Sequence, residues 1–249
     1  MNPISFIYQE ILFRPLFNLL VGLTVFLPGH SLGWAIIITT VLVRLVLLPF
    51  SIHQATHMHR NQKKMESLKS ELKKINEQHK DNPTEKNKVT MELYRKAGVN
   101  PVAGCLPLLI QLPVLIAIYR VFLHGLGPEN WQYLYSFVAH PAVLNLYFFG
   151  INITTPNLVL AILAGIGQFI QVRMMSPTPQ AAGQDDESAK MMASMQKNTN
   201  YIFPALTVFI ALRLPAALPI YWIVSTIFAV GQQYFIKRYM KVSLNTPVV

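Results

Sequence analysis

Residues 33–50 read GWAIIITTVLVRLVLLPF, an apolar run that contains a single charge, Arg44, and closes with Pro49 and Phe50. A helix needs about 20 mostly apolar residues to cross the ~30 Å hydrocarbon core of a bilayer. Together with its flanking residues, the run is long enough to cross this core, so residues 31–52 are predicted to form a membrane span. Arg44 makes this span unusual, because a charge is costly inside hydrocarbon.

The whole chain has the composition of a membrane protein. Of its 249 residues, 52% are hydrophobic and 13% are charged, and the mean hydropathy is +0.36. These values are typical of proteins that reside in a bilayer. The N-terminal residues lack the basic start and the cleavage site of a secretory signal peptide. The single cysteine, Cys105, allows no intrachain disulfide and no zinc-type spacing.

Four further apolar runs predict spans after the first one. The last two share one long run, residues 201–236, which Arg213 and Pro215 divide at a tight turn. The fourth helix is then short. The predicted fold class is an all-α polytopic membrane protein with five transmembrane helices, at 31–52, 100–124, 156–175, 200–214 and 215–237.

The N-terminal segment, residues 1–30, allows two interpretations. It is apolar enough to span, but Glu10, Arg14 and Pro15 interrupt it. The uninterrupted part, Leu16 to Leu27, would reach only ~18 Å as a helix. We therefore predict an interfacial helix on the outer surface, with an additional span as the alternative.

A polar segment between the first two spans is predicted to be a helical hairpin, residues 53–99. Residues 51–100 hold eleven of the 21 Lys and Arg and six of the 11 acidic residues. Met65, Leu68, Leu72 and Ile75 form a narrow apolar seam at helical spacing. The sequence DNP at 81–83 breaks the helix, and a second helix closes near Gly98. These features predict an antiparallel pair of helices that projects into water.

The distribution of basic residues predicts the topology. Besides the hairpin, Lys and Arg occur in the loop 176–199 and around the tail 238–249, whereas residues 121–155 contain none. Basic segments face the cytoplasm, so the N-terminus is predicted outside and the C-terminus inside a multi-pass protein of the cell inner or plasma membrane. The loop 125–155 is then external. Its aromatic residues are expected at the outer interface: Trp131, Tyr133, Tyr135, Tyr147 and Phe148.

The sequence alone allows two interpretations of Arg44. Its guanidinium either extends along the helix to the nearer interface, or it lines a water-filled cavity. Polar residues lie on several of the predicted spans, where one or two would be ordinary interhelical hydrogen-bonding groups. Their number favours a shared hydrated groove for substrate. The predicted groove residues are Arg44, Thr40, Gln111, Gln168, Gln171, Ser225 and Gln232.

Enzymatic chemistry has little support in the sequence. The five predicted spans contain no Asp or Glu, so the usual acid and base pair is missing, and Ser225 has no neighbouring His and Asp to activate it. His53 and His57, with His59 close by, have metal-ligand spacing, but a metal site needs further ligands, so we interpret them as interfacial polar residues. No enzyme activity, metal or cofactor is predicted.

Three stretches resemble a known family. The sequence NPVAGCLPLLIQLPVLIAIYR, residues 100–120, resembles the second core span of the YidC, Oxa and Alb membrane protein insertases. GWAIIITTVLVRLVLLPF resembles the first span, including its arginine, and LPIYWIVSTIFAVGQQYFIKR, residues 218–238, resembles the last. The similarity covers essentially the whole chain in the same order and corresponds to the minimal bacterial YidC form.

The resemblance implies a non-enzymatic insertase and chaperone for nascent membrane proteins, acting alone or with the Sec translocon. It implies a hydrophilic groove that is open to the cytoplasm and the lipid but closed on the outside, with Arg44 inside it and Gln111 nearby. Implied partners are nascent substrates, ribosome–nascent chain complexes, the SecY translocon and the lipid bilayer, with no specific nucleic acid. The chain departs from the family pattern at 215–218, PAAL in place of Pro-Ala-Gly-Leu, and in its short tail.

A transporter that uses Arg44 as its substrate charge is the alternative class. Transporters typically contain internal repeats with matched broken helices, and none is evident in this sequence.

Overall fold

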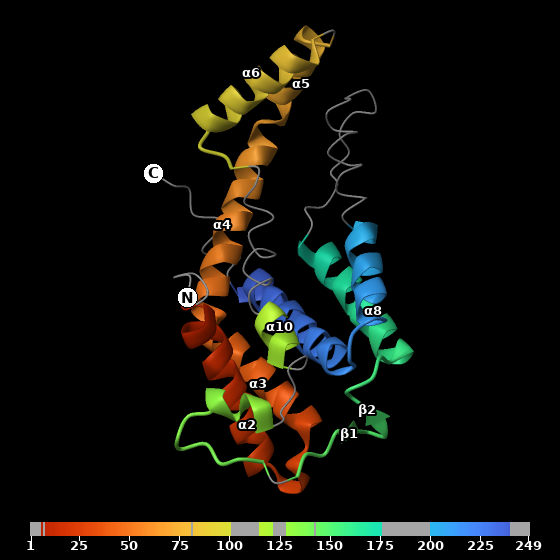
Figure 1. The fold of residues 1–249 in the computed structure, drawn as a ribbon. Coiled ribbons are helices and arrows are strands. Elements are labelled where there is room, and N and C mark those ends of the chain that lie inside the picture. Colours follow the sequence, from red (N-terminus) through yellow and green to blue (C-terminus); the bar gives the residue numbers. More distant parts are fainter. Residues whose placement is uncertain are drawn as a thin grey trace.

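The computed structural model describes residues 6, 8–80, 82–100, 115–121, 128–141, 143–175 and 200–239. Most of them are helical (Figure 1). A π-helical segment, η1 (Tyr8–Phe13), runs into α2 (Arg14–Phe26), and the short helix η2 (Pro28–His30) leads to α3 (Leu32–Val46). Gln111, Cys105, the loop 176–199 and residues 240–249 lie outside the described part.

The later elements follow in chain order. They are α4 (Leu48–Ser67), α5 (Lys69–Gln78), α6 (Pro83–Lys96), the short helix η4 (Pro128–Tyr133), β1 (Tyr147–Phe148), β2 (Ile151–Asn152), α8 (Leu158–Met175) and α10 (Ala217–Tyr239). Residues 115–121 are also helical, as is the segment Asn200–Ala211 before α10.

A small β-hairpin departs from the all-α prediction. Tyr147 pairs with Asn152 and Phe148 with Ile151 in an antiparallel ribbon. Phe149 and Gly150 form the turn, with φ of 47° and 77°. Positive φ at both central residues is the mark of a type I′ turn, whose twist suits a two-residue hairpin.

The main hydrophobic core joins α2, α3, residues 115–121 and the start of α10. Each element contributes fully buried side chains, among them Phe17, Ala35, Val121 and Leu218. α10 packs against both α3 and α8, so it forms the centre of the bundle (Figure 1). Within a bilayer, where the lipid is as apolar as these side chains, such packing stabilises the bundle mainly through van der Waals contact.

The first predicted span and the first arm of the hairpin are one bent helical pair. Pro49, in the first turn of α4, has no N–H to continue the α3 ladder. The axes of α3 and α4 differ by 59°. The helix therefore turns away from the bundle after Val46 and continues to Ser67, past the expected boundary at residue 52.

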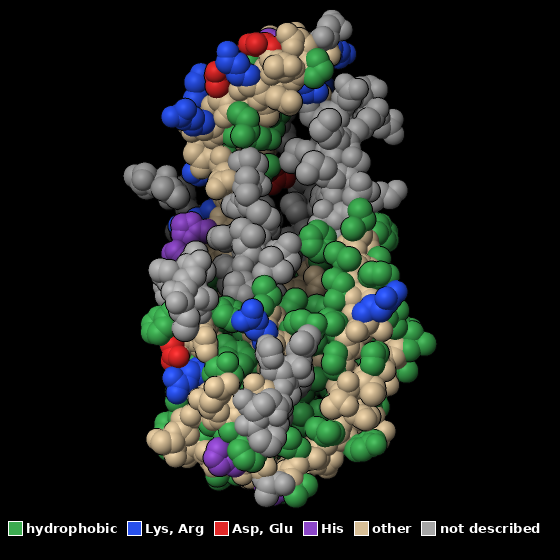
Figure 2. Space-filling view, viewed as in Figure 1, with side chains coloured by type: hydrophobic (Ala, Val, Ile, Leu, Met, Phe, Trp, Pro, Cys, Tyr) green, Lys and Arg blue, Asp and Glu red, His purple; other side chains and the backbone are tan. Residues whose placement is uncertain are grey.

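A second, smaller core holds the hairpin together. Leu68, Tyr94 and Val99 are buried, and Met65 and Leu72 of the predicted seam pack beside them. The side chain of Asn82 caps α6 by accepting a hydrogen bond from the Glu85 N–H at 3.2 Å. At the base, Asn61 donates to the Asn100 carbonyl at 2.8 Å and accepts from the Asn100 N–H at 3.0 Å. Charged side chains gather over α5 and α6 in Figure 2, whereas apolar side chains cover much of the lower body.

By length and composition, one helix of the described part, Tyr8–Phe26, is able to cross a membrane, and the bent pair of α3 and α4 passes the same test as a unit. The helix Asn200–Ala211 is apolar but shorter.

Glycines bring α8 close to its neighbours. A Cβ on Gly165 would lie 2.2 Å from Cγ2 of Val208, and one on Gly167 would lie 3.2 Å from Cγ2 of Thr226. Small residues allow such close approach between membrane helices. Gly165 thus sets the distance between α8 and the helix Asn200–Ala211.

Gly165→Ala is expected to destabilise the protein by about 1–3 kcal/mol, because the stiff Val208 side chain cannot move away without strain. Gly231→Ala, in α10, is the matched control, since no atom lies within 4 Å of the added Cβ. There the better helix propensity of Ala should stabilise by up to about 1 kcal/mol. Unfolding in detergent measures both, and equal stabilities would contradict the close packing of α8.

Candidate functional site: a buried arginine between two helices

Arg44 lies near the end of α3 and points toward α10. Its Nε donates to the Ser225 hydroxyl oxygen at 2.8 Å, and a second guanidinium N–H, on Nη2, donates to the same oxygen. Ser225 is 2% exposed, whereas Arg44 is half-buried. Two predicted groove residues from opposite ends of the sequence are therefore in direct contact.

A second polar pair lies two turns further along the same interface. The Ser51 hydroxyl lies 3.1 Å from Oε1 of Gln232 and 2.9 Å from the Leu48 carbonyl, so its single proton is donated to one of the two acceptors at a time. Ser51, on α4 just after the bend, is seven residues after Arg44, and Gln232 is seven after Ser225 on α10. The chain from α3 into α4 therefore runs in the same direction as α10, with matched polar positions. Ser51 was not among the predicted site residues, although its heptad spacing from Arg44 mirrors that of Ser225 and Gln232.

Two side chains, each one helical turn before Arg44 or Ser225, lie next to this contact. Tyr221, on α10, is buried one helical turn before Ser225. Thr40, on α3, is buried too, but its hydroxyl donates to the Ile36 carbonyl of its own helix at 2.6 Å. Thr40 therefore lines the site without offering its proton to a ligand.

A small pocket lies between Arg44 and the first turns of α3 and α10. Its floor includes Thr39, Thr40 and Tyr221, and Leu16 and Leu20 of α2 form part of its wall. The Thr39 hydroxyl is buried and makes no hydrogen bond within the described part of the chain. The other lining residues are apolar: Ile36, Ile118 and Val121.

The two predicted glutamines of α8 stand apart from the polar pairs. Gln168 and Gln171 are half-buried, and within the described residues neither is hydrogen-bonded to Arg44. Gly167 contacts Thr226, the neighbour of Ser225, so α8 reaches α10 at the level of Arg44. That Gln168 and Gln171 belong to the site remains a prediction. Gln111 lies outside the described part.

The electrostatic character of the site follows from its partners. Because Ser225 is a neutral hydroxyl, its two hydrogen bonds orient the guanidinium without cancelling the positive charge. A half-buried cation held in this way attracts anions and polar groups. The site has the features of a binding surface, with charge and hydrogen-bonding groups along one interface.

The histidines at the start of α4 do share a helix face. The rings of His53 and His57 lie 4.4 Å apart between centroids, and both side chains are exposed. In the described ranges no third His, Cys, Asp or Glu joins them in a cluster that could hold a metal. The pair offers two ligands, fewer than a structural metal site uses.

Comparisons with known proteins give one consistent result. The family profile described as "60Kd inner membrane protein" matches residues 24–243. The chain is 35% identical to a "Membrane protein insertase YidC" of Fusobacterium nucleatum, over 84% of this chain and 87% of that protein. It is 32% identical to "Membrane protein insertase MisCA" of Bacillus subtilis, over 85% and 72%. It is also 31% identical to a YidC insertase of Ectopseudomonas mendocina, of which it covers 31%.

The Arg44–Ser225 contact should appear as a coupling energy in a double-mutant cycle. Arg44→Ala and Ser225→Ala, alone and combined, are expected to show a coupling of about 1.5–3 kcal/mol in detergent unfolding, because the hydrogen bonds involve a charged donor. Thr226→Ala is the matched control, since Thr226 is equally buried but packs against Gly167. Coupling of Arg44 to Thr226 as strong as to Ser225 would contradict a specific hydrogen bond.

Proposed function

This chain belongs to the 60Kd inner membrane protein family, and from that premise we propose how it acts as a membrane protein insertase. The family is one of non-enzymatic insertases, and its members reside in membranes. In our proposal, a hydrophilic groove around Arg44 receives the polar segment of a nascent client, while the client's apolar helix moves directly into lipid. The arginine oriented by a neutral hydroxyl is the observation that carries this mechanism.

The groove would act by lowering the cost of moving polar groups across hydrocarbon. A polar group that leaves water without a hydrogen-bond partner costs several kcal/mol. Ser51 and Gln232 provide partners on the side of the bent helix α4, and Arg44 and Ser225 provide them two turns deeper. A client tail would therefore find polar partners at each step toward the middle of the membrane, and an acidic tail would gain the attraction of Arg44 as well.

The short helix before α10 supports the same mechanism. Asn200–Ala211 would extend ~18 Å along its axis, against a hydrocarbon core of ~30 Å. A helix that is too short thins the bilayer around it. The polar path past Arg44 would be shorter for the same reason.

The outer side of the groove is closed by the N-terminal helix in our proposal. The core partners of α2 lie at the ends of their elements that the topology places outside: the first turns of α3, residues 118–121 and the start of α10. The Tyr8 ring also lies against Arg120, with the Arg120 Cζ 5.3 Å from the ring centroid. Along its length, the N-terminal helix thus contacts the proposed outer ends of the other helices. These contacts favour a helix that lies on the outer surface.

Buried hydrogen bonds join the middle of this helix to the external loop. Asn18, 5% exposed, donates to the Tyr133 carbonyl at 2.8 Å and accepts from the Tyr135 N–H at 2.6 Å. Arg14 donates to the same Tyr133 carbonyl at 3.3 Å and pairs with Glu10 at 2.8 Å. If residues 8–26 crossed the bilayer, Arg14 and Asn18 would lie near its centre, far from a loop of the outer surface.

The complete proposal has five spans, a cytoplasmic hairpin that meets substrate, an external N-terminus and a cytoplasmic C-terminus in the inner or plasma membrane. Nascent membrane proteins on ribosomes are the proposed partners, with or without the SecY translocon. Gln111, Gln168 and Gln171 are proposed as further groove residues, alongside Thr40, Ser225 and Gln232.

The topology is tested with single cysteines in a Cys105→Ala background. Phe6→Cys should react with an impermeant thiol reagent added outside intact cells, because the N-terminal helix lies on the outer face. Lys73→Cys, in the hairpin, should react only after the cells are opened. A Phe6 site that stays protected outside but reacts in opened cells would favour an N-terminal span, and outside labelling at Lys73 would overturn the charge-based topology.

The role of Arg44 is tested with clients that differ only in tail charge. Arg44→Lys should keep much of the insertion activity, because the task requires a positive charge and not a bidentate fork. Arg44→Ala should impair acidic-tail clients first and uncharged-tail clients less. Insertion in proteoliposomes measures this, with the amount of folded protein determined in parallel.

Arg173→Ala is the matched control for this experiment. Arg173 lies at the last turn of α8 and covers the Phe169 ring at 5.3 Å, away from Ser225. Its loss should affect both clients alike. Equal insertion of acidic-tail clients by Arg44→Ala and the unchanged protein would leave Arg44 as a snorkelling residue and remove the electrostatic part of the mechanism.

A further inference from the structure

The β1–β2 hairpin is fixed to the helical bundle on both sides. On one side, the Leu32 N–H donates to the Asn145 carbonyl at 3.1 Å, and the Asn145 N–H donates to the His30 carbonyl at 3.0 Å. On the other, the Ala217 N–H donates to the Ile153 carbonyl at 3.0 Å, and the Ala216 N–H donates to the Thr155 carbonyl at 2.9 Å. The hairpin is thus clamped between the starts of α3 and α10.

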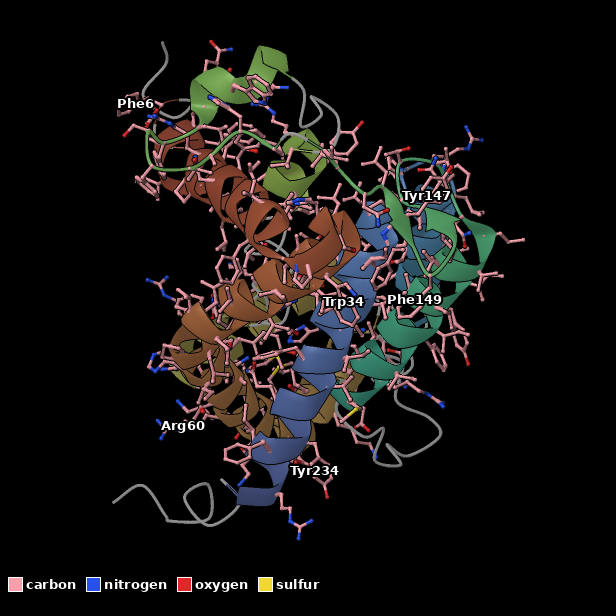
Figure 3. The ribbon with its side chains drawn as sticks, turned by 90° about the horizontal axis from the view of Figure 1, so that it is seen from below. Phe6, Trp34, Arg60, Tyr147, Phe149 and Tyr234 are labelled. Carbon is pink, nitrogen blue, oxygen red and sulfur yellow. The ribbon has the colours of Figure 1, made fainter. Side chains whose placement is uncertain are left out.

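Its aromatic side chains divide between the core and the surface. Phe148 packs inward over Gly33, where a Cβ would come within 2.3 Å of the ring. Tyr147 is 61% and Phe149 83% exposed. Trp34, 48% exposed, meets the Phe148 ring at 5.5 Å and the Phe149 ring at 6.3 Å between centroids. Figure 3, seen from this end of the protein, shows Trp34 and Phe149 side by side.

Phe149 occupies a position that favours other residues. Its φ of 47° is left-handed, a conformation that Gly and Asn adopt readily and that is strained for a bulky side chain. Asn-Gly is the preferred pair in a type I′ turn, yet this turn reads Phe149-Gly150. The Phe149 ring meets the Phe148 ring at 4.6 Å between centroids, but most of its surface remains exposed, so contacts inside the protein offset only part of the strain.

We propose that Trp34, Tyr147 and Phe149 form an anchor that inserts into the headgroup and glycerol region of the outer lipid leaflet. Trp and Tyr, whose rings have a polar group on an apolar body, concentrate at that depth, and Phe149 adds exposed apolar area beside Trp34. The residues 121–155 contain no Lys or Arg, and the anchor continues into exposed apolar residues at the start of α8, Leu158, Val159 and Ile162. The inference rests on the proposed external position of the hairpin.

The anchor would set the depth of Arg44 in the membrane. Gly33, under Phe148, and Arg44 are eleven residues apart on α3, or ~16 Å along the axis. Because the hairpin is clamped to the first turn of α3, holding its tip at the interface holds Arg44 at a defined distance below it.

Tryptophan fluorescence in lipid nanodiscs tests the anchor directly. The intact chain carries Trp34→Phe, Trp131→Phe and Trp222→Phe, and Phe149→Trp provides the single reporter. The nanodiscs contain phosphatidylethanolamine and phosphatidylglycerol, with bromine either near the top or near the end of the acyl chains. Both faces of a nanodisc are open to acrylamide, so orientation does not affect the result.

We expect blue-shifted emission at position 149, strong quenching by bromine near the top of the acyl chains and weak quenching by acrylamide. Thr154→Trp in the same background is the matched control, because Thr154 is exposed in the same loop. It should be quenched by acrylamide and not by lipid. Tyr147→Trp is a second reporter should the variant at 149 fail to incorporate.

Equal acrylamide quenching at 149 and 154 would overturn the proposal, since the tip would then lie in water. Protection of 149 from both lipid and acrylamide would also overturn it, because the tip would then be covered by protein. In the chain with native tryptophans, Phe149→Asn should leave the unfolding temperature in detergent unchanged or higher while weakening the anchor. The depth measurement requires no insertion activity, so its failure and that of the proposed insertion mechanism are distinguishable.

Discussion

The hydrogen bonds between Arg44 and Ser225 impose the main constraint on this fold. A guanidinium within an apolar span requires polar partners, and Ser225 is presented to it from a helix that lies 181 residues later in the chain. α3 and α10 must therefore run side by side in the same direction, with their polar positions in register. The Ser51–Gln232 pair repeats the arrangement two turns further along. α2 and α8 then pack on either side of this central pair.

The two ends of that helix pair differ in how tightly they are covered. At one end, Phe17, Leu32 and Leu218 belong to one buried cluster, and Leu16 and Leu20 close the pocket above Thr39 and Thr40. At the other end, Pro49 bends the chain by 59°, and α4 leaves the bundle. Packing thus covers one end of the pair, whereas α4 diverges from the bundle beyond the other end. An insertase with a one-sided groove needs this asymmetry, because an opening at both ends would form a channel.

Periodicity and composition predicted the parts of the fold that are long and regular. The apolar run around Arg44, the seam at Met65, Leu68 and Leu72, and the polar residues Ser225 and Gln232 of the last helix were all evident in the sequence. The β-hairpin was missed because its strands have two residues each, too short for an alternating pattern, and its turn lacks the Asn-Gly signal. The aromatic loop was expected at the interface as a whole, but Tyr133 and Phe148 pack against the core.

The candidate site was predicted less completely, for reasons of geometry. Sequence position placed Thr40 one turn from Arg44, yet its hydroxyl is engaged by its own helix at Ile36. Ser51 was missed because it follows Pro49, where the predicted span was near its end, although the helix continues beyond. Whether a polar side chain faces a partner depends on helix rotation, which the contacts of α10 with α3 and α8 determine and a single sequence does not encode locally.

The neutrality of Ser225 suits a site that must bind and then release a client. A carboxylate in its place would neutralise Arg44, and separating a buried ion pair costs about 3–5 kcal/mol. A hydrogen bond from a charged donor to a hydroxyl contributes only about 1.5–3 kcal/mol, which a passing acidic or carbonyl group can replace at little net cost. In the proposed mechanism, Ser225 orients the guanidinium, and its hydroxyl adds no negative charge that an anionic or polar client segment would have to displace.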